Sequence, residues 1–318
     1  MPKLFEVSTL YLHQVKLVRS EATYKNYMYV VKELRAYFGN IRIKTISESR
    51  FMEFISAKSE SVSPGTIRAI MTRTRTFFGW CRKHGYLEKN IVADLELPRP
   101  IKKSEHERSI SQDDLNKLLR YAYTRNERDF AFIMMLASTG ARMSAIVGLR
   151  LEDLNLQART AFAIEKGNQP VTIRYDRPTV FALKRYLDVR PTPRPFHDFV
   201  WCNLNHEGHQ AIKYTGANAM LKRYGRAAGC SKPVSGHQFR HKIGQDWSRR
   251  PDVSPVDTQK KLNHKNFWTT YHYYYADQSD KLRDLTDSYD FLPDDIQDEL
   301  CTQDTPLNII KFPFLDDL

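Results

Sequence analysis

A run of prolines and charged residues at 97–108 (LPRPIKKSEHER) is the strongest constraint on how this chain folds. Proline has no backbone N–H and disfavours helix in the residue before it, so the run is predicted to bar a helix and stay solvated. With 318 residues, the chain is long enough for two domains that each have a core. We therefore predict a first domain at 1–98, a linker at 99–108, a second domain at 109–289 and a tail at 290–318.

Residues 1–98 are predicted to be all-helical. Apolar residues recur at steps of three and four along 24–38, and Gly39 follows as a stop signal. A second helix is predicted over 64–84, because Ser63 is a cap residue and proline occupies the first helical position. Its predicted buried stripe consists of Ile67, Ile70, Met71, Phe77, Phe78 and Cys81.

The opposite face of this second helix is polar and basic. It carries side chains at steps of four, three and seven: Arg68, Thr72, Arg75 and Arg82. Such a helix can bury one side and lay arginines along DNA phosphates with the other. The simpler interpretation is a solvated arginine face, and the helix taken alone does not decide between the two.

The second domain is predicted to be mostly helical with one small antiparallel sheet. It begins with SQDDL at 111–115, a cap followed by acids, and a buried helix at 130–137 ends at Thr139-Gly140. Two strand-like runs, 160–165 and 170–175, flank a short turn and indicate a hairpin. Further helices are predicted at 178–188, 214–228, 235–248, 255–263 and 268–276.

Spaced segments of this domain carry cationic or proton-transferring groups. Arg142 follows the tight turn TGAR, and His237 and Arg240 in HQFRH sit three apart, so on a helix they share a face. Arginine's planar fork fits two phosphate oxygens and stays charged, so Arg142 and Arg240 suit the stabilisation of a phosphoryl transfer. His264 precedes a cluster of possible phenol nucleophiles: Tyr271, Tyr273, Tyr274 and Tyr275.

The segments TGARMSAIVGLRLEDL and HQFRH, with His264 and the tyrosines after it, resemble the motifs of the tyrosine recombinase family, the lambda-integrase-like and Xer-like enzymes. The resemblance covers 109–290 through spaced motifs and 1–98 only as a generic helical, SAM-like DNA-binding domain. It implies a C-shaped clamp on double-stranded DNA with paired half-sites. It also implies strand cutting and rejoining through a 3′-phosphotyrosyl link, without ATP, metal or cofactor.

The resemblance also implies the site residues and their roles. Arg142 and Arg240 would bind the scissile phosphate, and Lys166, in EKGNQPVTI, would protonate the leaving 5′ oxygen. His237 would transfer or position a proton, and His264 would donate a hydrogen bond to a non-bridging oxygen. His241 is expected to pack or hydrogen-bond internally. The family's attacking tyrosine follows the histidine by nine residues.

That offset selects Tyr273 as the nucleophile, with Tyr274 as the alternative. On a helix, Tyr271, Tyr274 and Tyr275 would share a side and form core contacts, while Tyr273 would point elsewhere. The sequence alone leaves the register open by one residue.

Two positions depart from the family pattern. Ala145 stands where the family often has an acid, and whether Glu152 or Asp153 substitutes for it is open. Asn263 stands where the family usually has glycine. Asparagine tolerates left-handed backbone angles, so the turn can survive. These departures support one alternative, a recombinase-like protein that binds DNA but cuts slowly or not at all.

Charge agrees with a nucleic-acid partner. The formal net charge is +12 and the pI about 9.4. Residues 290–318 hold eight acids and one lysine, so residues 1–289 carry +19. The same tail is rich in apolar residues. The resemblance implies that it docks on a neighbouring copy within a tetramer on DNA, and a tail packed in cis is the alternative.

Other classes are less well supported. His237, His241 and His264 could be zinc ligands, but Gln238 stands where the metalloprotease motif needs glutamate. A topoisomerase or telomere resolvase would use the same chemistry as a recombinase. The motifs do not distinguish integration or excision of a mobile element from resolution of a replicon.

The sequence predicts a cytoplasmic protein without a membrane span. The four cysteines are far apart and form no CxxC pair, so neither a disulfide framework nor a cysteine zinc site is expected. No segment reaches the ~20 apolar residues of a membrane helix.

Overall fold

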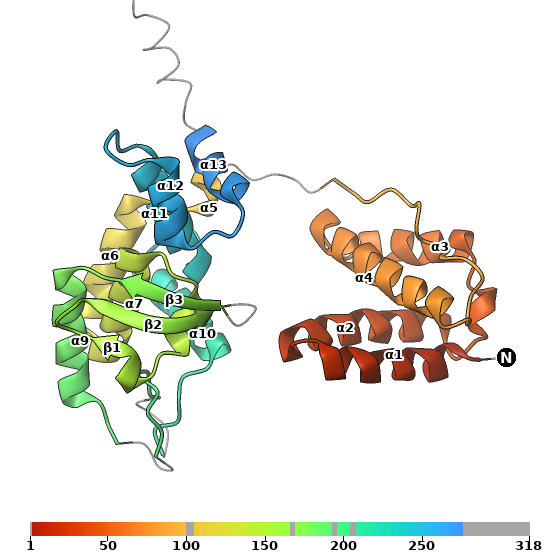
Figure 1. Cartoon of the computed structure of the whole chain (residues 1–318), viewed down its shortest axis with the longest axis horizontal. Coiled ribbons are helices and arrows are strands. Elements are labelled where there is room, and N and C mark those ends of the chain that lie inside the picture. The colour runs from red at the N-terminus through yellow and green to blue at the C-terminus, as the bar shows by residue number, and fades with distance from the viewer. Residues whose placement is uncertain (1, 100–104, 166–168, 193–195, 204–207, 276–318) are drawn as a thin grey trace, which may run out of the picture. The chain divides into compact units, whose positions relative to one another are not determined.

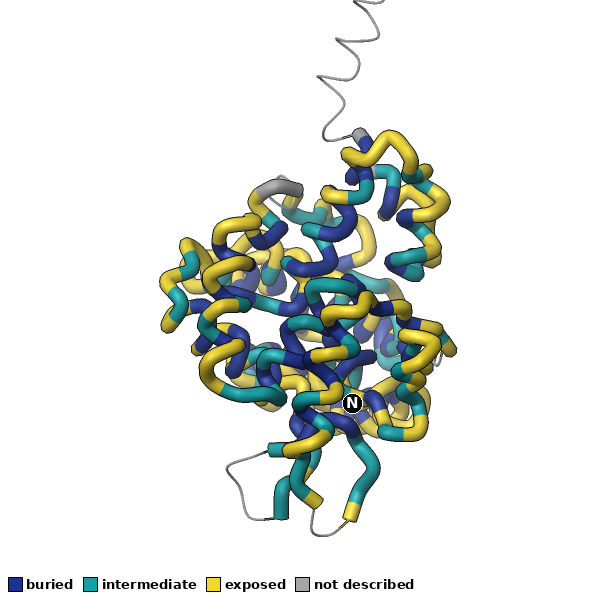
Figure 2. Tube along the Cα trace, turned by 90° about the vertical axis from the view of Figure 1, so that its left-hand side faces the viewer, coloured by how far each residue is buried: buried dark blue, intermediate teal, exposed yellow. Residues whose placement is uncertain are grey.

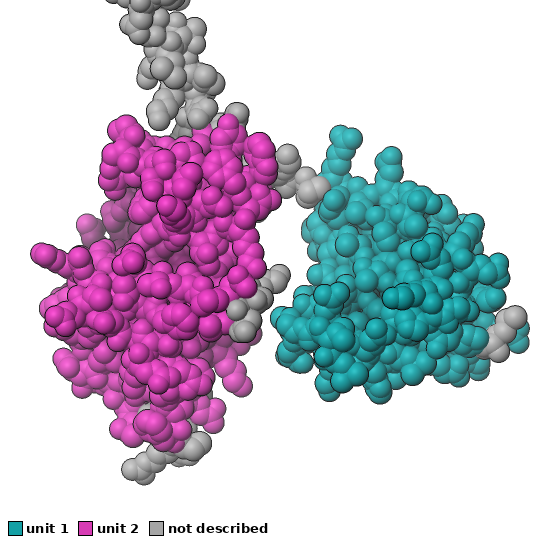
Figure 3. All heavy atoms as spheres, viewed as in Figure 1, with its two compact units in different colours: residues 1–102 teal, residues 103–318 magenta. Residues whose placement is uncertain are grey.

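The chain forms two compact units, Met1–Lys102 and Lys103–Leu318 (Figure 3). The computed structural model describes residues 2–99, 105–165, 169–192, 196–203 and 208–275. Each unit has its own buried cluster of apolar side chains.

The first unit is a bundle of four helices (Figure 1). In chain order these are α1 (Leu4–Val18), α2 (Glu21–Phe38), α3 (Glu48–Ser59) and α4 (Pro64–Lys83), with a 3₁₀ turn η1 (Ile43–Thr45) before α3. Serine side chains at 20, 47 and 63 accept hydrogen bonds from first-turn N–H groups, so each fixes the start of a helix. Gly39, with φ of 67°, ends α2 as predicted.

Aromatic rings fill the core of this unit. Phe51, Phe54, Phe77 and Phe78 are all at most 1% exposed, and their rings contact one another with centroids 5.3–6.4 Å apart. The six residues predicted as the buried stripe of α4 are buried. The amphipathic pattern of this helix therefore locates the core correctly.

The second unit combines helices with a three-stranded antiparallel sheet (Figure 1). Its helices are α5 (Glu105–Arg108), α6 (Gln112–Tyr123), α7 (Glu127–Thr139), α8 (Met143–Val147), α9 (Arg177–Val189), α10 (Tyr214–Ala227), α11 (Gly236–Ser248), α12 (Pro255–Leu262) and α13 (Phe267–Tyr275). The strands are β1 (Leu154–Asn155), β2 (Thr160–Glu165) and β3 (Gln169–Arg174), in the order β1-β2-β3, preceded by a 3₁₀ turn η2 (Leu151–Asp153).

Trp201 lies at the centre of the second core. It is fully buried, its ring stacks on Tyr186 at 5.5 Å with an interplanar angle of 6°, and it meets Phe132 edge to face at 5.1 Å. Its Nε1–H donates to the Ile146 carbonyl at 2.7 Å. The indole thereby fixes α8, which follows Arg142, to the body of the unit. Figure 2 shows buried positions (dark blue) running through the interior.

The mostly helical fold with a small antiparallel sheet is confirmed, and the predicted hairpin and later helices form within a residue or two of the expected bounds. One prediction is wrong: the linker does not bar helix throughout, because residues 105–108 form α5. Prolines at 98 and 100 restrict their own neighbours but not a turn five residues on. The two-residue strand β1 was also missed, being too short to show a period.

None of the described helices is both long enough and apolar enough to cross a membrane.

We expect Trp201→Phe to lower the free energy of unfolding by about 2 kcal/mol, because it removes a buried hydrogen bond and leaves a small cavity. Urea unfolding followed by circular dichroism measures the change. Trp268→Phe is the matched control, since Trp268 is 65% exposed and its loss should cost less than about 0.5 kcal/mol. Equal effects of the two substitutions would contradict this account of the core.

Candidate active site

Arg142 is presented by a tight turn at the end of α7. Gly140 adopts a left-handed conformation with φ of 59° and caps the helix. A Cβ at this glycine would lie 3.0–3.1 Å from side-chain atoms of Leu262 and Ile243, so the turn packs closely on α11 and α12. Arg142 then forms the N-cap of α8, and its side chain is 31% exposed.

Arg240, on α11, is buried at 6% exposure and joins two loops. Its Nη1 donates to the Gly140 carbonyl at 3.0 Å, and its Nη2 donates to the Leu262 carbonyl. Burial lowers the pKa of its guanidinium to about 10, with a further contribution from the positive charge of Arg142. One side chain therefore ties the turn before Arg142 to the end of α12, next to His264.

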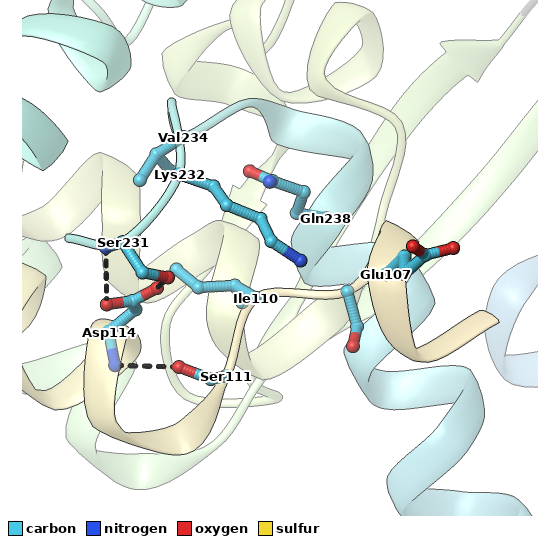
Figure 4. Close-up of a pocket in the computed structure, with 9 residues that line it drawn as sticks. Glu107, Ile110, Ser111, Asp114, Ser231, Lys232, Val234 and Gln238 are labelled. Carbon is cyan, nitrogen blue, oxygen red and sulfur yellow. Dashed lines mark hydrogen bonds between the residues drawn. The ribbon is translucent and has the colours of Figure 1, made fainter. Parts of the chain in front are cut away.

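The start of α11 is fixed from α6. Asp114 accepts hydrogen bonds from Ser231, at 3.0 Å from its backbone N and 2.6 Å from its Oγ (Figure 4). The Gln238 side chain accepts from the Ser235 N–H at 2.7 Å, which closes a capping box. These contacts, beside a pocket of about 160 Å³, set where His237 enters the helix.

His264 follows the left-handed residue Asn263, whose φ and ψ are 48° and 52°. The histidine is 8% exposed, and its Nδ1 lies 2.8 Å from Thr270 Oγ1. Burial lowers its pKa to about 4, and the charges of Arg240 and Arg142 add to this. The imidazole is therefore neutral at pH 7. Asparagine keeps the turn that the family builds with glycine.

Tyr273 lies against α11 and is 4% exposed. Its hydroxyl is 3.1 Å from His241 Nδ1, and its ring stacks on His264 with centroids 6.1 Å apart. A Cβ at Gly244 would lie 2.6–2.8 Å from the Tyr273 ring, so only glycine permits this approach.

The neighbouring tyrosines have other contacts. Tyr274 is 8% exposed, and its hydroxyl lies 2.7 Å from Thr258 Oγ1 and donates to the Val253 carbonyl at 3.2 Å. Tyr271 contacts the rings of Phe267 and Trp268. We expected Tyr273 to point away from the core. It is instead buried, because the missing side chain at 244 leaves room for its ring.

Glu165 is the acidic partner of Arg142. The carboxylate is buried at the end of β2, where its Oε2 accepts from Arg142 Nη1. The same oxygen accepts from Asn263 Nδ2 at 3.1 Å. Of the two acids considered from the sequence, Glu152 is exposed and Asp153 accepts from the backbone N–H of Arg150 at 2.9 Å. Neither is the acid paired with Arg142.

A pocket of about 440 Å³ opens at this cluster. It is lined by Arg142, Glu165, Gln169, Asn263, His264, Lys265, Asn266 and Thr269. His237 lies on the first turn of α11, where burial and the charges of His241, Arg240 and Arg142 lower its pKa. The predicted general acid, Lys166, lies outside the described residues, but the strands that flank it end beside this pocket.

The four DNA-binding candidates lie on α4 of the first unit. Arg82 and Thr72 are exposed. Arg75 donates to the Val92 carbonyl at 3.0 Å and the Leu95 carbonyl at 2.6 Å, and Arg68 donates to the Pro98 carbonyl at 3.1 Å. Two of the arginines thus fasten the segment after α4 to the helix.

The zinc alternative needs three converging ligands. In the part of the chain that the structure describes, no group of three or more histidines, cysteines or acids is placed to hold a metal ion.

His241 was expected to pack or hydrogen-bond internally, and it does, since its Nδ1 lies 3.1 Å from the Tyr273 hydroxyl. Two contacts at the site were missed from sequence: this one with Tyr273 and that of Glu165 with Arg142. For the contact of His241, the available signal was its place four residues after His237, which puts both histidines on one helix face. The sequence offers no signal for the contact of Glu165 with Arg142, since that contact depends on how the sheet packs on α8.

Two family models match the chain. The model described as "Phage integrase family" matches residues 108–280, and "Phage integrase, N-terminal SAM-like domain" matches residues 3–59.

Individual tyrosine recombinases are also similar to this chain. Tyrosine recombinase XerD of Listeria innocua serovar 6a is 29% identical over 69% of this chain and 74% of its own length. XerD of Listeria monocytogenes serovar 1/2a is 28% identical over 77% and 81%. A crystal structure of a lambda integrase dimer bound to a core site superposes with a TM-score of 0.69 at 14% identity, covering 84% of this chain and 97% of that one. These structures share the fold.

We expect the imidazole of His264 to titrate near pH 4 in NMR spectra, with its signal assigned by its absence in His264→Asn. The folded pKa lies below the unfolded value of about 6.5, so the fold loses stability as pH falls from about 6.5 to about 4. Arg142→Ala should move the midpoint upward, because a neighbouring positive charge is removed. A midpoint near 6.5 in the unmodified protein would contradict the described burial.

Proposed function

The chain belongs to the phage integrase family and is a site-specific DNA recombinase of the tyrosine type, and on this premise we propose that Tyr273 is its nucleophile. The observation that carries the proposal is the position of the Tyr273 ring, which stacks on His264 beside Arg240, the side chain that binds the turn before Arg142. Attack of a phenol on a phosphodiester requires cations that stabilise the phosphoryl oxygens, and Arg240 and Arg142 are proposed to supply them.

The proposed reaction is a transesterification. The Tyr273 oxygen attacks the phosphorus, the bond from phosphorus to the 5′ oxygen breaks, and a 3′-phosphotyrosyl link forms. Arg142 and Arg240 stabilise the charge on the phosphoryl oxygens. Arg240 has five N–H donors, and the two backbone carbonyls use only part of them. The 5′-hydroxyl of a partner strand then attacks the phosphotyrosine and restores the bond.

Proton transfers complete both steps. His241 Nδ1, at 3.1 Å from the Tyr273 hydroxyl, is within hydrogen-bond reach to accept the phenol proton. His264, neutral at pH 7, can donate from its remaining ring nitrogen to a non-bridging oxygen. His237 remains proposed as a positioning group for the phosphate. Lys166 is proposed, from its place in the hairpin, to protonate the leaving 5′ oxygen.

Contacts support Tyr273 over Tyr274. The Tyr274 hydroxyl bonds to Thr258 and to the Val253 carbonyl, which lie on α12 and just before it. The Tyr273 hydroxyl faces α11, which carries Arg240 and His241. In the second environment the phenol lies beside Arg240, whose guanidinium is proposed to bind the phosphate.

We expect the purified protein to form an SDS-resistant adduct with nicked DNA from the ends of its own locus, which traps the intermediate. Tyr273→Phe should abolish the adduct. Tyr274→Phe should retain it, because that hydroxyl has a structural partner. An adduct lost only in Tyr274→Phe would shift the nucleophile by one residue. DNA binding without any adduct would favour a recombinase-like protein that no longer cuts.

The partner is double-stranded DNA, and we propose that the first unit, 1–98, contacts it through α4. The similar lambda integrase and XerH structures are complexes with DNA sites. Arg82 and Thr72, exposed on α4, are proposed to contact phosphates, and Arg68 and Arg75 to do so with the donors that their backbone contacts leave.

Arg82→Ala should weaken DNA binding uniformly across sequences and reduce the salt slope by about one, without changing the melting temperature. Arg75→Ala should instead destabilise the first unit by about 1–3 kcal/mol, because two carbonyls lose their donor. Binding titrations at several salt concentrations, with calorimetry of both variants, separate the two effects. Loss of stability in Arg82→Ala would contradict this assignment.

We further propose a tetramer on DNA, since the similar lambda integrase was solved as a tetramer bound to a Holliday junction. The tail at 290–318, which lies outside the described residues, is proposed to dock in trans. Action on a mobile element or replicon would place the enzyme in the cytoplasm with that DNA.

In the proposed reaction, Arg142 and Arg240 supply the positive charge.

A further inference from the structure

One carboxylate oxygen joins three elements of the active site. Glu165 ends β2, Arg142 begins α8, and Asn263 ends α12. Glu165 Oε2 accepts from Arg142 Nη1 and, at 3.1 Å, from Asn263 Nδ2. The Glu165 side chain is only 4% exposed, while that of Arg142 is 31% exposed.

Burying this charge is unfavourable in itself. A carboxylate removed from water must be paired and hydrogen-bonded, and an apolar residue of similar size would fill such a place at no electrostatic cost. Its charge-assisted bond to Arg142 restricts the guanidinium to one orientation. The structural effect of the carboxylate is thus its hold on Arg142.

We propose that Glu165 is a positioning residue for strand cleavage, which orients Arg142 for the scissile phosphodiester and, through Asn263, couples it to the loop carrying His264. The inference rests on the proposed function of the site. Arg142, Glu165, Asn263 and His264 all line the pocket of about 440 Å³. In this proposal the scissile phosphate and the Glu165 carboxylate therefore both bind the guanidinium of Arg142.

This arrangement has opposite effects on binding and on chemistry. The negative charge of Glu165 repels a phosphodiester that enters the pocket, so it weakens DNA binding in the ground state. A fixed guanidinium, however, is in place for the charge that develops in the transition state. Glu165 therefore raises the rate of cleavage at the expense of affinity.

The same contact sets the base of the hairpin. Glu165 pairs with Gln169 in the antiparallel register, and both residues flank the segment 166–168. The contact of Glu165 with Arg142 therefore fixes the last residue of β2. The contact that orients Arg142 thus also positions the end of β2.

The test is single-turnover cleavage of a nicked DNA substrate, together with a binding titration. Glu165→Gln should leave the dissociation constant unchanged or smaller and slow cleavage at saturating DNA about 10- to 100-fold. Glu152→Gln is the matched control, because it removes one negative charge from an exposed carboxylate and should leave the rate unchanged. Equal rates for Glu165→Gln and the unmodified protein would overturn the proposal.

A parallel loss of affinity and rate in a Glu165→Gln protein with an unchanged melting temperature would also overturn it, since a positioning role predicts a slower rate without a loss of affinity. Asn263→Gly provides a second measurement if Glu165→Gln does not fold, because glycine accepts the left-handed turn and removes only the amide. It should slow cleavage less than Glu165→Gln, and the double variant should be no slower than Glu165→Gln alone. Independent, multiplicative effects would exclude coupling through Glu165. Absence of any adduct from the unmodified protein would instead refute the proposed function itself.

Discussion

The buried guanidinium of Arg240 is the interaction on which the site depends. It binds the carbonyls of Gly140 and Leu262, and so holds together the two loops that carry Arg142 and His264. A buried charge of this kind needs several partners, and here backbone oxygens supply them without neutralising the charge. The positive charge therefore remains available to a phosphate. Substituting Arg240 would open the site as well as remove a cation.

Burial also determines the charges of the side chains near Arg240. Arg142 and Arg240 lower the pKa of His264, so the histidine that stacks on Tyr273 is neutral. A neutral imidazole adds no further repulsion between the site's cations, yet it keeps a donor. Glu165 is the one buried acid that pairs with Arg142. The guanidinium of Arg142, the carboxylate of Glu165 and the neutral ring of His264 thus line a single pocket.

Local chemistry in the sequence was enough to predict most of the fold. Helix caps, the glycine stops and the alternating hairpin are local signals, and the predicted elements form where those signals stand. Arg142, Arg240, His264 and Tyr273 were predicted as site residues from short motifs that resemble those of the family. The contact between Glu165 and Arg142 was not predicted, since it joins residues 23 apart on different elements. The room for Tyr273 depends likewise on a missing side chain at 244, which only packing reveals.

The order of the elements along the chain has a consequence for synthesis. Arg142, Arg240 and His264 all precede Tyr273, which lies on α13, the last described helix. A chain that emerges from the ribosome amino end first therefore presents these three side chains before Tyr273, the proposed nucleophile. With the proposed nucleophile on the last described helix, the other proposed site residues are all synthesised before the phenol that would break a strand.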